Sequence, residues 1–524
     1  MNKKHDQIIH KKGSFFMHHK NIKALVRKQL KRNYRHWNRL NKKDKKRIAK
    51  MVLDEVEKGY DFRNEIKTSE PELLGIENQL PTPGIMNLEE MERFIKSHKD
   101  DMLFKLNRHK RHPTYLKDKE LRFIDDMLDD QIINMLLSYD GYSPSMRGLF
   151  PSNYLRAELL KTIKYPEISY RKFCGDDKTY KGHKSNSGYI GMENKQNRIF
   201  IGLPLNKKRM ISHVQMSQFR SSLSFKQLVN LIVYILYHFK MAGFLDGGII
   251  HCVDSTELAI ERQELLATLT IKGKKIRVYD DIDCDCGKRR TKRDKSVYVV
   301  GYRLHTITAI NANTGQSIPL VSLLAPANHH DSHFLKYLVQ FGKAIGLELR
   351  LITADEAYHD NDDVIYSENN VHLIRPPDSK VSLPEHVDKE TLRVKCNDFC
   401  EIPMEYAGIG EEGHEYKCKA EYGQCPHAAM CPGYRSIPID NGYFQRILYG
   451  DEQVLEALEI RKNGERPFNL IKKREGLETV RVRSQHGLIV RSAFTTIATL
   501  LLEMAGTRRK KKQKQTSFLD AVGF

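Results

Sequence analysis

Two apolar runs of strand length, each ending in an aspartate, constrain the fold of this chain most strongly. Ile249 to Val253 runs into Asp254, and Leu349 to Ala354 runs into Asp355. Short apolar runs of this kind are typical of strands buried in a sheet. The residues between and after them predict a hairpin (298–323), a helix capped by Asp331 (331–346), a second helix (361–368) and a strand (371–374).

The net charge of +21 is concentrated at the two ends of the chain. Residues 1–50 carry a net charge of +16 and residues 508–514 carry +6, while residues 51–507 sum to zero. Basic arms on a neutral body are typical of proteins that hold nucleic acid, although such arms can also serve solubility alone.

The remaining composition excludes other classes of protein. No run of about 18 apolar residues predicts a membrane span, and no secretory signal is visible. Nine cysteines, an odd number in a large chain, do not suggest a disulfide scaffold. We therefore expect a reduced, cytoplasmic protein that does not enter a membrane.

The order strand, hairpin, helix, strand, helix, strand is that of an RNase H-like sheet. We predict an α/β RNase H-like catalytic domain, a mixed sheet flanked by helices, with a largely helical N-terminal region and a Cys-rich insertion. The expected divisions are a basic helical DNA-binding region (1–110), a helical domain (111–245), the first part of the core (246–376), the insertion (377–440), the second part of the core (441–506) and a basic tail (507–524).

The two strand-end aspartates indicate a metal site. Reactive groups collect at the carboxyl ends of strands in such sheets, and adjacent strands would bring Asp254 and Asp355 close together. Neighbouring carboxylates repel each other unless a cation lies between them, and hard oxygen ligands select Mg²⁺ or Mn²⁺. Aspartates at strand ends also serve as turn formers or helix caps, so this pair alone leaves the choice open.

Four sequence blocks, in this order and spacing, resemble bacterial insertion-sequence transposases of the DDE type, over roughly residues 210–505. The blocks are Val253–Thr256, Gly301–His305, Pro326–Asp331 and Thr353–Tyr358. One branch of that family carries a Y-x2-R-x3-E-x6-K signature, whose spacing is met here by Arg461, Glu465 and Lys472, with Leu458 at the Tyr position.

The resemblance implies that Asp254, Asp355 and Glu465 are catalytic and hold two Mg²⁺ or Mn²⁺ ions, while Arg461 and Lys472 contact DNA near the cut. On an unbroken helix, Arg461, Glu465 and Lys472 share one face, but Asn463, Gly464 and Pro467 disfavour a helix interior. A helix that restarts near Gly464 would put Pro467 in its first turn. Alternative third acids are Glu456, Glu459 and Glu475.

Other residues of these blocks are expected to be structural. Asn328 and Asp331 are expected to serve as turn and cap residues, and His305 to be satisfied in the core.

Five cysteines in residues 377–440 offer thiolates for one structural Zn²⁺: Cys396, Cys400, Cys418, Cys425 and Cys431. A segment rich in Gly and Pro has little apolar core of its own, which favours a metal over free thiols.

The sequence thus predicts a transposase that cuts double-stranded DNA at transposon ends and joins them to target DNA. The resemblance further implies a homodimer on paired ends in the bacterial cytoplasm, associated with the nucleoid. The alternatives are a transposase-derived DNA-binding protein without catalysis and a hydrolytic metal-dependent nuclease.

Overall fold

The computed structural model describes residues 26–28, 30–31, 37, 40–61, 75–98, 116–138, 149–175, 184–185, 188–189, 191–205, 211–245, 249–261, 264–271, 274–281, 283–290, 296–311, 315–376, 383–388, 391–397, 402–419, 430–431, 433–438, 450–469, 471–472, 477 and 484–521. Most of the predicted basic arm in residues 1–50 lies outside these residues.

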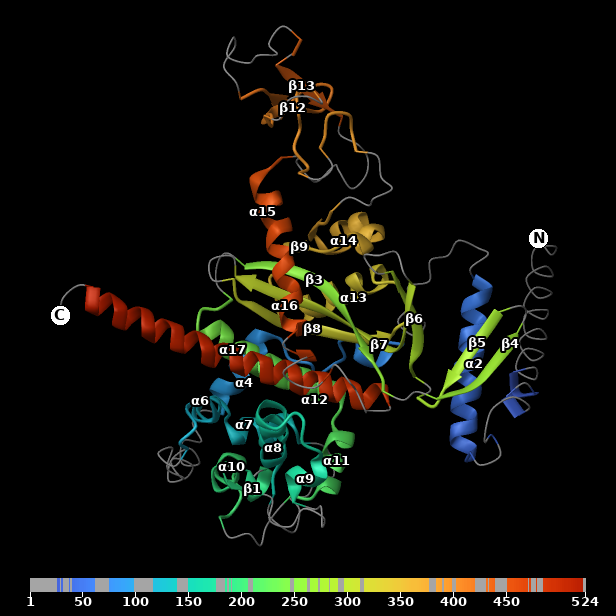
Figure 1. The fold of residues 1–524 in the computed structure, drawn as a ribbon, viewed down its shortest axis with the longest axis vertical. Coiled ribbons are helices and arrows are strands. Elements are labelled where there is room, and N and C mark those ends of the chain that lie inside the picture. The colour runs from blue at the N-terminus through green and yellow to red at the C-terminus, as the bar shows by residue number, and fades with distance from the viewer. Residues whose placement is uncertain are drawn as a thin grey trace, which may run out of the picture.

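The first part of the described chain is helical (Figure 1). Its helices are α2 (Lys42–Asp61), α4 (Leu88–Ser97), α6 (Lys119–Met127), α7 (Asp130–Leu136), α8 (Pro151–Lys164), α9 (Tyr170–Cys174), α10 (Lys195–Ile201), α11 (His213–Ser222) and α12 (Phe225–Met241). Seven of these begin after a side chain that accepts a hydrogen bond from the first turn: Asn87, Asp118, Asp129, Ser169, Asn194, Ser212 and Ser224. Such caps satisfy backbone N–H groups that have no partner inside the helix. Short elements lie between them: η2 (Glu77–Gln79), β1 (Lys184–Ser185), β2 (Gly188–Tyr189) and η5 (Gly191–Glu193).

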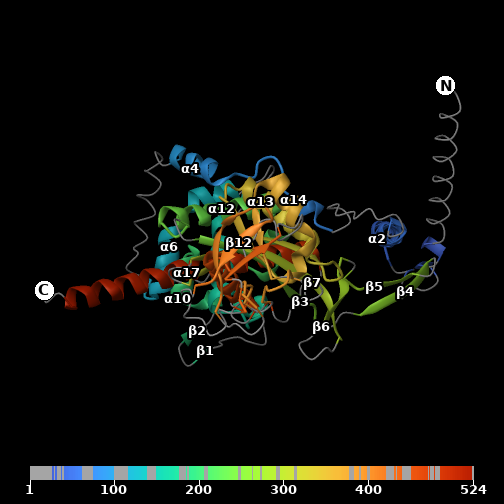
Figure 2. The ribbon, with the colours of Figure 1, turned by 90° about the horizontal axis from the view of Figure 1, so that it is seen from above.

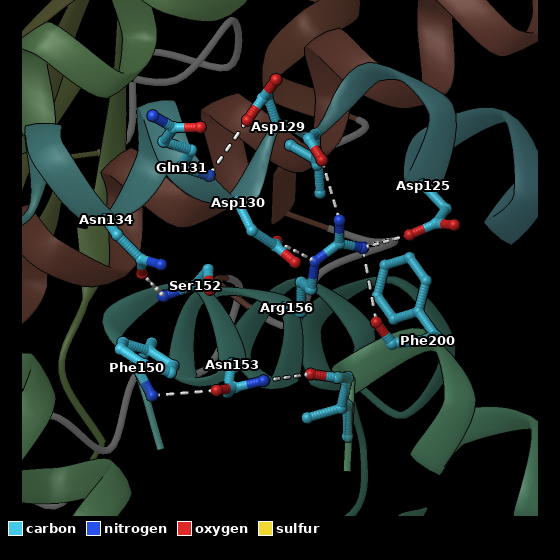
Figure 3. Close-up of polar contacts among 12 residues, drawn as sticks. Asp125, Asp129, Asp130, Gln131, Asn134, Phe150, Ser152, Asn153, Arg156 and Phe200 are labelled. Carbon is cyan, nitrogen blue, oxygen red and sulfur yellow. Dashed lines mark hydrogen bonds and ion pairs between the residues drawn. The ribbon is translucent and has the colours of Figure 1, made fainter. Parts of the chain in front are cut away.

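A buried arginine joins four of these helices (Figure 3). Arg156 of α8 is only 1% exposed. Its guanidinium donates to Asp125 at 2.5 Å and Asp130 at 2.7 Å, and to the carbonyls of Leu128 at 2.8 Å and Phe200 at 3.3 Å. A buried charge is tolerated only when it is paired and hydrogen-bonded, so this residue holds α6, α7, α8 and α10 together.

The second part of the chain builds a mixed sheet. Its strands are β3 (Ile249–Ala259), β6 (Asp285–Arg290), β7 (Ser296–Asn311), β8 (Ser317–Pro326), β9 (Leu351–Thr353) and β10 (His372–Ile374). The strand order is β10-β9-β3-β7-β6, and β8 also pairs with β7. β3 is antiparallel to β7 and parallel to β9, β9 is parallel to β10, and β7 is antiparallel to β6 and β8.

Helices cover both faces of this sheet. They are α13 (Ser332–Ala344), η6 (Glu356–Asn361), α14 (Asp362–Asn369), α15 (Glu452–Arg461), η8 (Lys462–Glu465), α16 (Arg466–Asn469) and α17 (Gln485–Ala521). On one face the main core joins Val253 and Ile307 to α12, α13 and α17. On the other, Ile250 packs against Ala457 of α15. Because side chains alternate along β3, even-numbered residues face α15 and odd-numbered residues face α13.

Two smaller units stand beside the sheet (Figures 1 and 2). The hairpin of β4 (Leu265–Ile271) and β5 (Lys274–Tyr279) packs against α2. A three-stranded antiparallel sheet of β11 (Glu405–Ile409), β12 (His414–Lys417) and β13 (Tyr434–Ile437) lies beyond α15.

The predicted order of strands and helices after residue 248 is confirmed, and the sheet with its helices is an α/β fold. The β4–β5 hairpin between β3 and β6 was not predicted.

One described helix stretch, Gln485–Gly506, is apolar and long enough to cross a membrane, but 83% of its most apolar 18-residue window is buried inside the protein. A helix in the core of a soluble protein can be equally long and apolar.

Candidate active site

Asp254 lies on the face of β3 that is covered by α15 and η8. The backbone N–H of Ser255 donates to its Oδ1 at 2.7 Å. Burial, together with the negative charges of Asp355 and Glu465, raises the pKa of Asp254 to about 7, although the hydrogen bond from Ser255 and the charge of Arg461 act to lower it. A carboxyl group in such surroundings releases its proton more readily when a cation is near.

Asp355 lies two residues after the end of β9 at Thr353. β3 and β9 pair in parallel, with His251 opposite Ile352 and Cys252 opposite Thr353. The same register continued by two residues places Asp355 beside Asp254. Burial raises the pKa of Asp355, and the neighbouring charge of Asp331 raises it as well. The prediction that the two strands are adjacent is confirmed.

η8, which carries Glu465, makes a close contact with β3. A Cβ built on Gly464 would lie 2.5 Å from Cys252 Sγ, so only glycine allows this approach. Cys252 and Asp254 point to the same face of β3 because they are two residues apart. Glu465, the residue after Gly464, is exposed, and its charge acts on Asp254.

The chain around Glu465 is not one continuous helix. α15 ends at Arg461, η8 spans Lys462–Glu465, and α16 begins at Arg466 with Pro467 in its first turn. Of the two alternatives, the unbroken helix on which Arg461, Glu465 and Lys472 would share one face is excluded, and the restart near Gly464 is confirmed. The physical reason is that Gly and Pro disfavour a continuous helix here.

The two predicted DNA-contacting residues lie in different places. Arg461 is half-buried, its charge lowers the pKa of both Asp254 and Asp355, and its Nε has no hydrogen-bond partner among the described residues. The positive charge of Arg461 thus acts on the carboxylates of Asp254 and Asp355. Lys472 is half-buried in a short π-helical turn after α16.

The alternative third acids differ in position from Glu465. Glu456 and Glu459 are exposed on α15, and Glu459 pairs with Lys462 at 2.5 Å. Neither is among the charges that act most strongly on Asp254. Glu475 lies outside the described residues.

The donor set of Asp254, Asp355 and Glu465 fits a hard divalent cation. Carboxylate oxygens are the ligands that Mg²⁺ and Mn²⁺ prefer, and the charges of Asp355 and Glu465 raise the pKa of Asp254, so a cation would relieve this repulsion. Across the described ranges, no three His, Cys, Asp or Glu side chains are already grouped to hold a metal ion.

Two expectations about neighbouring residues are wrong. Asp331 makes no side-chain cap on α13, because its carboxylate is engaged with the sheet instead. His305 is buried, but neither ring nitrogen has a hydrogen-bond partner in the described part of the chain, and the ring stacks on Phe334 at 3.9 Å. Residues 303 and 305 lie two positions apart in a predicted strand and therefore share one face of it. This spacing is the sequence signal that Arg303 and His305 lie in the same surroundings.

Three of the five predicted zinc-binding cysteines are described. The Sγ atoms of Cys396 and Cys431 lie 2.8 Å apart, and Cys418 packs against the same small core. Burial, and after it hydrogen bonds involving Cys431 and Cys418, raise the pKa of Cys396. Cys400 and Cys425 lie outside the described residues.

Comparison with protein families finds one match. Residues 246–501 match the family described as transposase DDE domain. Comparison with curated proteins finds no significant match.

Proposed function

Residues 246–501 of this chain belong to the transposase DDE domain family, and on that premise we propose that the protein cuts DNA at transposon ends and joins those ends to target DNA. The observation that carries this proposal is that the charges of Asp355 and Glu465 both act on Asp254, with β9 paired to β3 and η8 packed against it.

The sheet supports an RNase H-like assignment of the catalytic domain. Three antiparallel strands (β8, β7 and β3) are followed by two strands parallel to β3 (β9 and β10), as the order of elements in the sequence predicted. Asp355 lies just beyond the carboxyl end of β9. β3 continues past Asp254 to Ala259, so the prediction that this strand ends at Asp254 is wrong, and Asp254 instead lies level with the end of β9.

Asp254, Asp355 and Glu465 would hold two Mg²⁺ or Mn²⁺ ions. Bound there, such ions activate the attacking oxygen and stabilise the leaving oxygen of a phosphoryl transfer. The three side chains provide the negative charge that the ions need. Arg461 offsets part of that charge, which supports a role in holding a DNA phosphate beside the acids, and Lys472 is proposed to contact DNA nearby.

The proposed partners are double-stranded transposon ends and target DNA, bound by a homodimer in the bacterial cytoplasm. The basic ends of the chain support the DNA partner, because Lys and Arg release counterions from the phosphate backbone.

The proposal is tested by neutral substitutions of the three acids. Asp254→Asn, Asp355→Asn and Glu465→Gln should each lower cleavage and joining by orders of magnitude, since each tenfold loss is about 1.4 kcal/mol of transition-state stabilisation. Binding to end DNA should persist in a gel shift. Glu456→Gln and Glu459→Gln are the matched controls and should cut normally.

Four outcomes would reject parts of the proposal. Full metal-dependent cleavage by both aspartate variants would reject the site. A dead Glu456→Gln beside an active Glu465→Gln would reassign the third acid. Cleavage without joining, assayed with a 3′-hydroxyl end and target DNA, would favour a hydrolytic nuclease, and binding without any cleavage would favour a transposase-derived DNA-binding protein.

We also propose one structural Zn²⁺ held by the Cys-rich segment. The approach of Cys396 and Cys431 supports it, and thiolates suit zinc whereas the acids suit magnesium. Elemental analysis of the purified protein should find about one zinc per chain. Cys396→Ser together with Cys431→Ser should remove it, and a protein without zinc would reject the idea.

A further inference from the structure

Asp331 lies at the start of α13, but its carboxylate contacts the sheet. Its Oδ2 accepts a hydrogen bond from Ser255 Oγ at 3.0 Å, and its Oδ1 accepts one from Arg303 Nη1 at 2.5 Å. Arg303 also donates to Glu257 at 3.3 Å. Only 12% of the Asp331 side chain is exposed, so these contacts are largely shielded from water.

The register of β3 and β7 explains why these side chains meet. Ser255 lies opposite His305, and Glu257 lies opposite Arg303. Directly opposed residues share a face, and residues two apart on a strand share it too. All four therefore point toward α13, where Asp331 completes the group.

Ser255 connects this group to the proposed metal site. Its hydroxyl donates to Asp331, and its backbone N–H donates to Asp254 Oδ1 at 2.7 Å. The side chains of Ser255 and Asp254 lie on opposite faces of β3. A shift of Ser255 would thus move the carboxylate of Asp254.

The charge of Asp331 also reaches the second aspartate. Burial alone would raise the pKa of Asp331, but His305, Arg303 and the hydrogen bonds lower it overall, so the group stays ionised. Its charge raises the pKa of Asp355. Tyr358 is fully buried near Asp331, Asp355 and Asp254, and its hydroxyl lacks a hydrogen-bond partner among the described residues.

We propose that Asp331 is a positioning residue for the metal site: it orients Asp254 through Ser255 and adds negative charge that strengthens cation binding. This inference rests on the proposed function. Residues that orient metal ligands affect affinity strongly, and losing one typically costs about 10–100-fold.

The test measures Mn²⁺ binding without DNA, by the signal of free Mn²⁺ in electron paramagnetic resonance. Ser255→Ala and Asp331→Asn should each weaken binding by at least about tenfold, while Ser255→Thr, which keeps the hydroxyl, should bind like wild type. Ser322→Ala is the matched control, because it removes an interstrand hydrogen bond to Thr306 of 2.9 Å in the same sheet. Its Mn²⁺ affinity should not change.

The outcomes separate this inference from the proposed function. If Asp254→Asn abolishes Mn²⁺ binding while Ser255→Ala and Asp331→Asn bind like wild type, the site stands and the positioning role is rejected. If Asp254→Asn binds Mn²⁺ like wild type, the proposed metal site itself is rejected. Equal losses in Ser322→Ala and Ser255→Ala, with equal losses of thermal stability, would show a general effect on the sheet and also reject the positioning role.

Discussion

At the scale of single residues, the helical region contains a lysine in unusual surroundings. Lys161 of α8 is 2% exposed, and its Nζ donates to the carbonyl of Pro166 at 3.0 Å. Burial, and after it the nearby charge of Arg491, lower the pKa of Lys161 to about 7. Folding therefore favours the neutral amine, whereas an unfolded lysine keeps its proton up to about pH 10.4.

This shift predicts a pH dependence of stability. Between about pH 7 and pH 10 the unfolded chain binds more protons at this residue, so the free energy of unfolding should rise with pH. Lys161→Met should remove that rise, as measured by urea unfolding at several pH values. In Lys164→Met, the control, the rise should remain, because Glu120 and Asp118 outweigh burial and raise the pKa of Lys164. An unchanged rise in Lys161→Met would contradict the assignment.

At the scale of elements, one contact sets the position of Glu465. η8 approaches β3 at Gly464, which lies against Cys252, and Ser317 Oγ of β8 donates to the carbonyl of Asn463 at 3.0 Å. These contacts come from strands far away in the sequence. They hold a segment of η8 that has little helical propensity of its own.

Gly464→Ala should displace η8 and lower cleavage by up to roughly 100-fold, since a shift of about 1 Å in a catalytic group can cost that much. The reason is the 2.5 Å distance from the added Cβ to Cys252 Sγ. Adding Cys252→Ala should restore part of the activity by removing that sulfur. Cleavage by Gly464→Ala at the wild-type rate would show that this contact does not position Glu465.

At the scale of the whole molecule, the basic N-terminal region is attached to the transposase domain by a packed interface. Val52 of α2 shares a small core with Leu269 and Val278 of the β4–β5 hairpin. Arg47 pairs with Asp283 at 2.5 Å. Cations of α2 are thereby held at a defined place beside the domain that carries the acids (Figure 2).

Replacing the exposed Lys42, Lys43, Lys46 and Lys50 by Gln should weaken DNA binding and its salt dependence. The slope of log affinity against log salt should fall by up to about 3.6, because each phosphate contact contributes about 0.9. The matched control replaces the exposed Lys117, Lys119, Lys195 and Lys226 by Gln, with the same loss of charge in the helical region. Equal effects of the two variants would mean that DNA affinity depends on the net charge of the protein and not on the position of the α2 lysines.

The sequence by itself determined the local features of this protein. Apolar periodicity predicted β3, β7, β8, β9 and β10, the helices between them and their order, but not the β4–β5 hairpin. The apolar runs before Asp254 and Asp355 identified β3 and β9 as neighbours in the sheet. The uneven charge indicated a polyanion as partner. These features could be predicted because each depends on residues within a few positions of one another.

Only the tertiary structure decided which distant residues meet. Gly464 lies against Cys252, Asp331 reaches Ser255 and Arg303, and α2 packs on a hairpin more than 200 residues further along the chain. A cap at Asp331 was a sound local expectation, but an arginine and a serine from two strands compete successfully for its carboxylate. Packing of buried surfaces and pairing of buried charges select these contacts, and no local pattern encodes them.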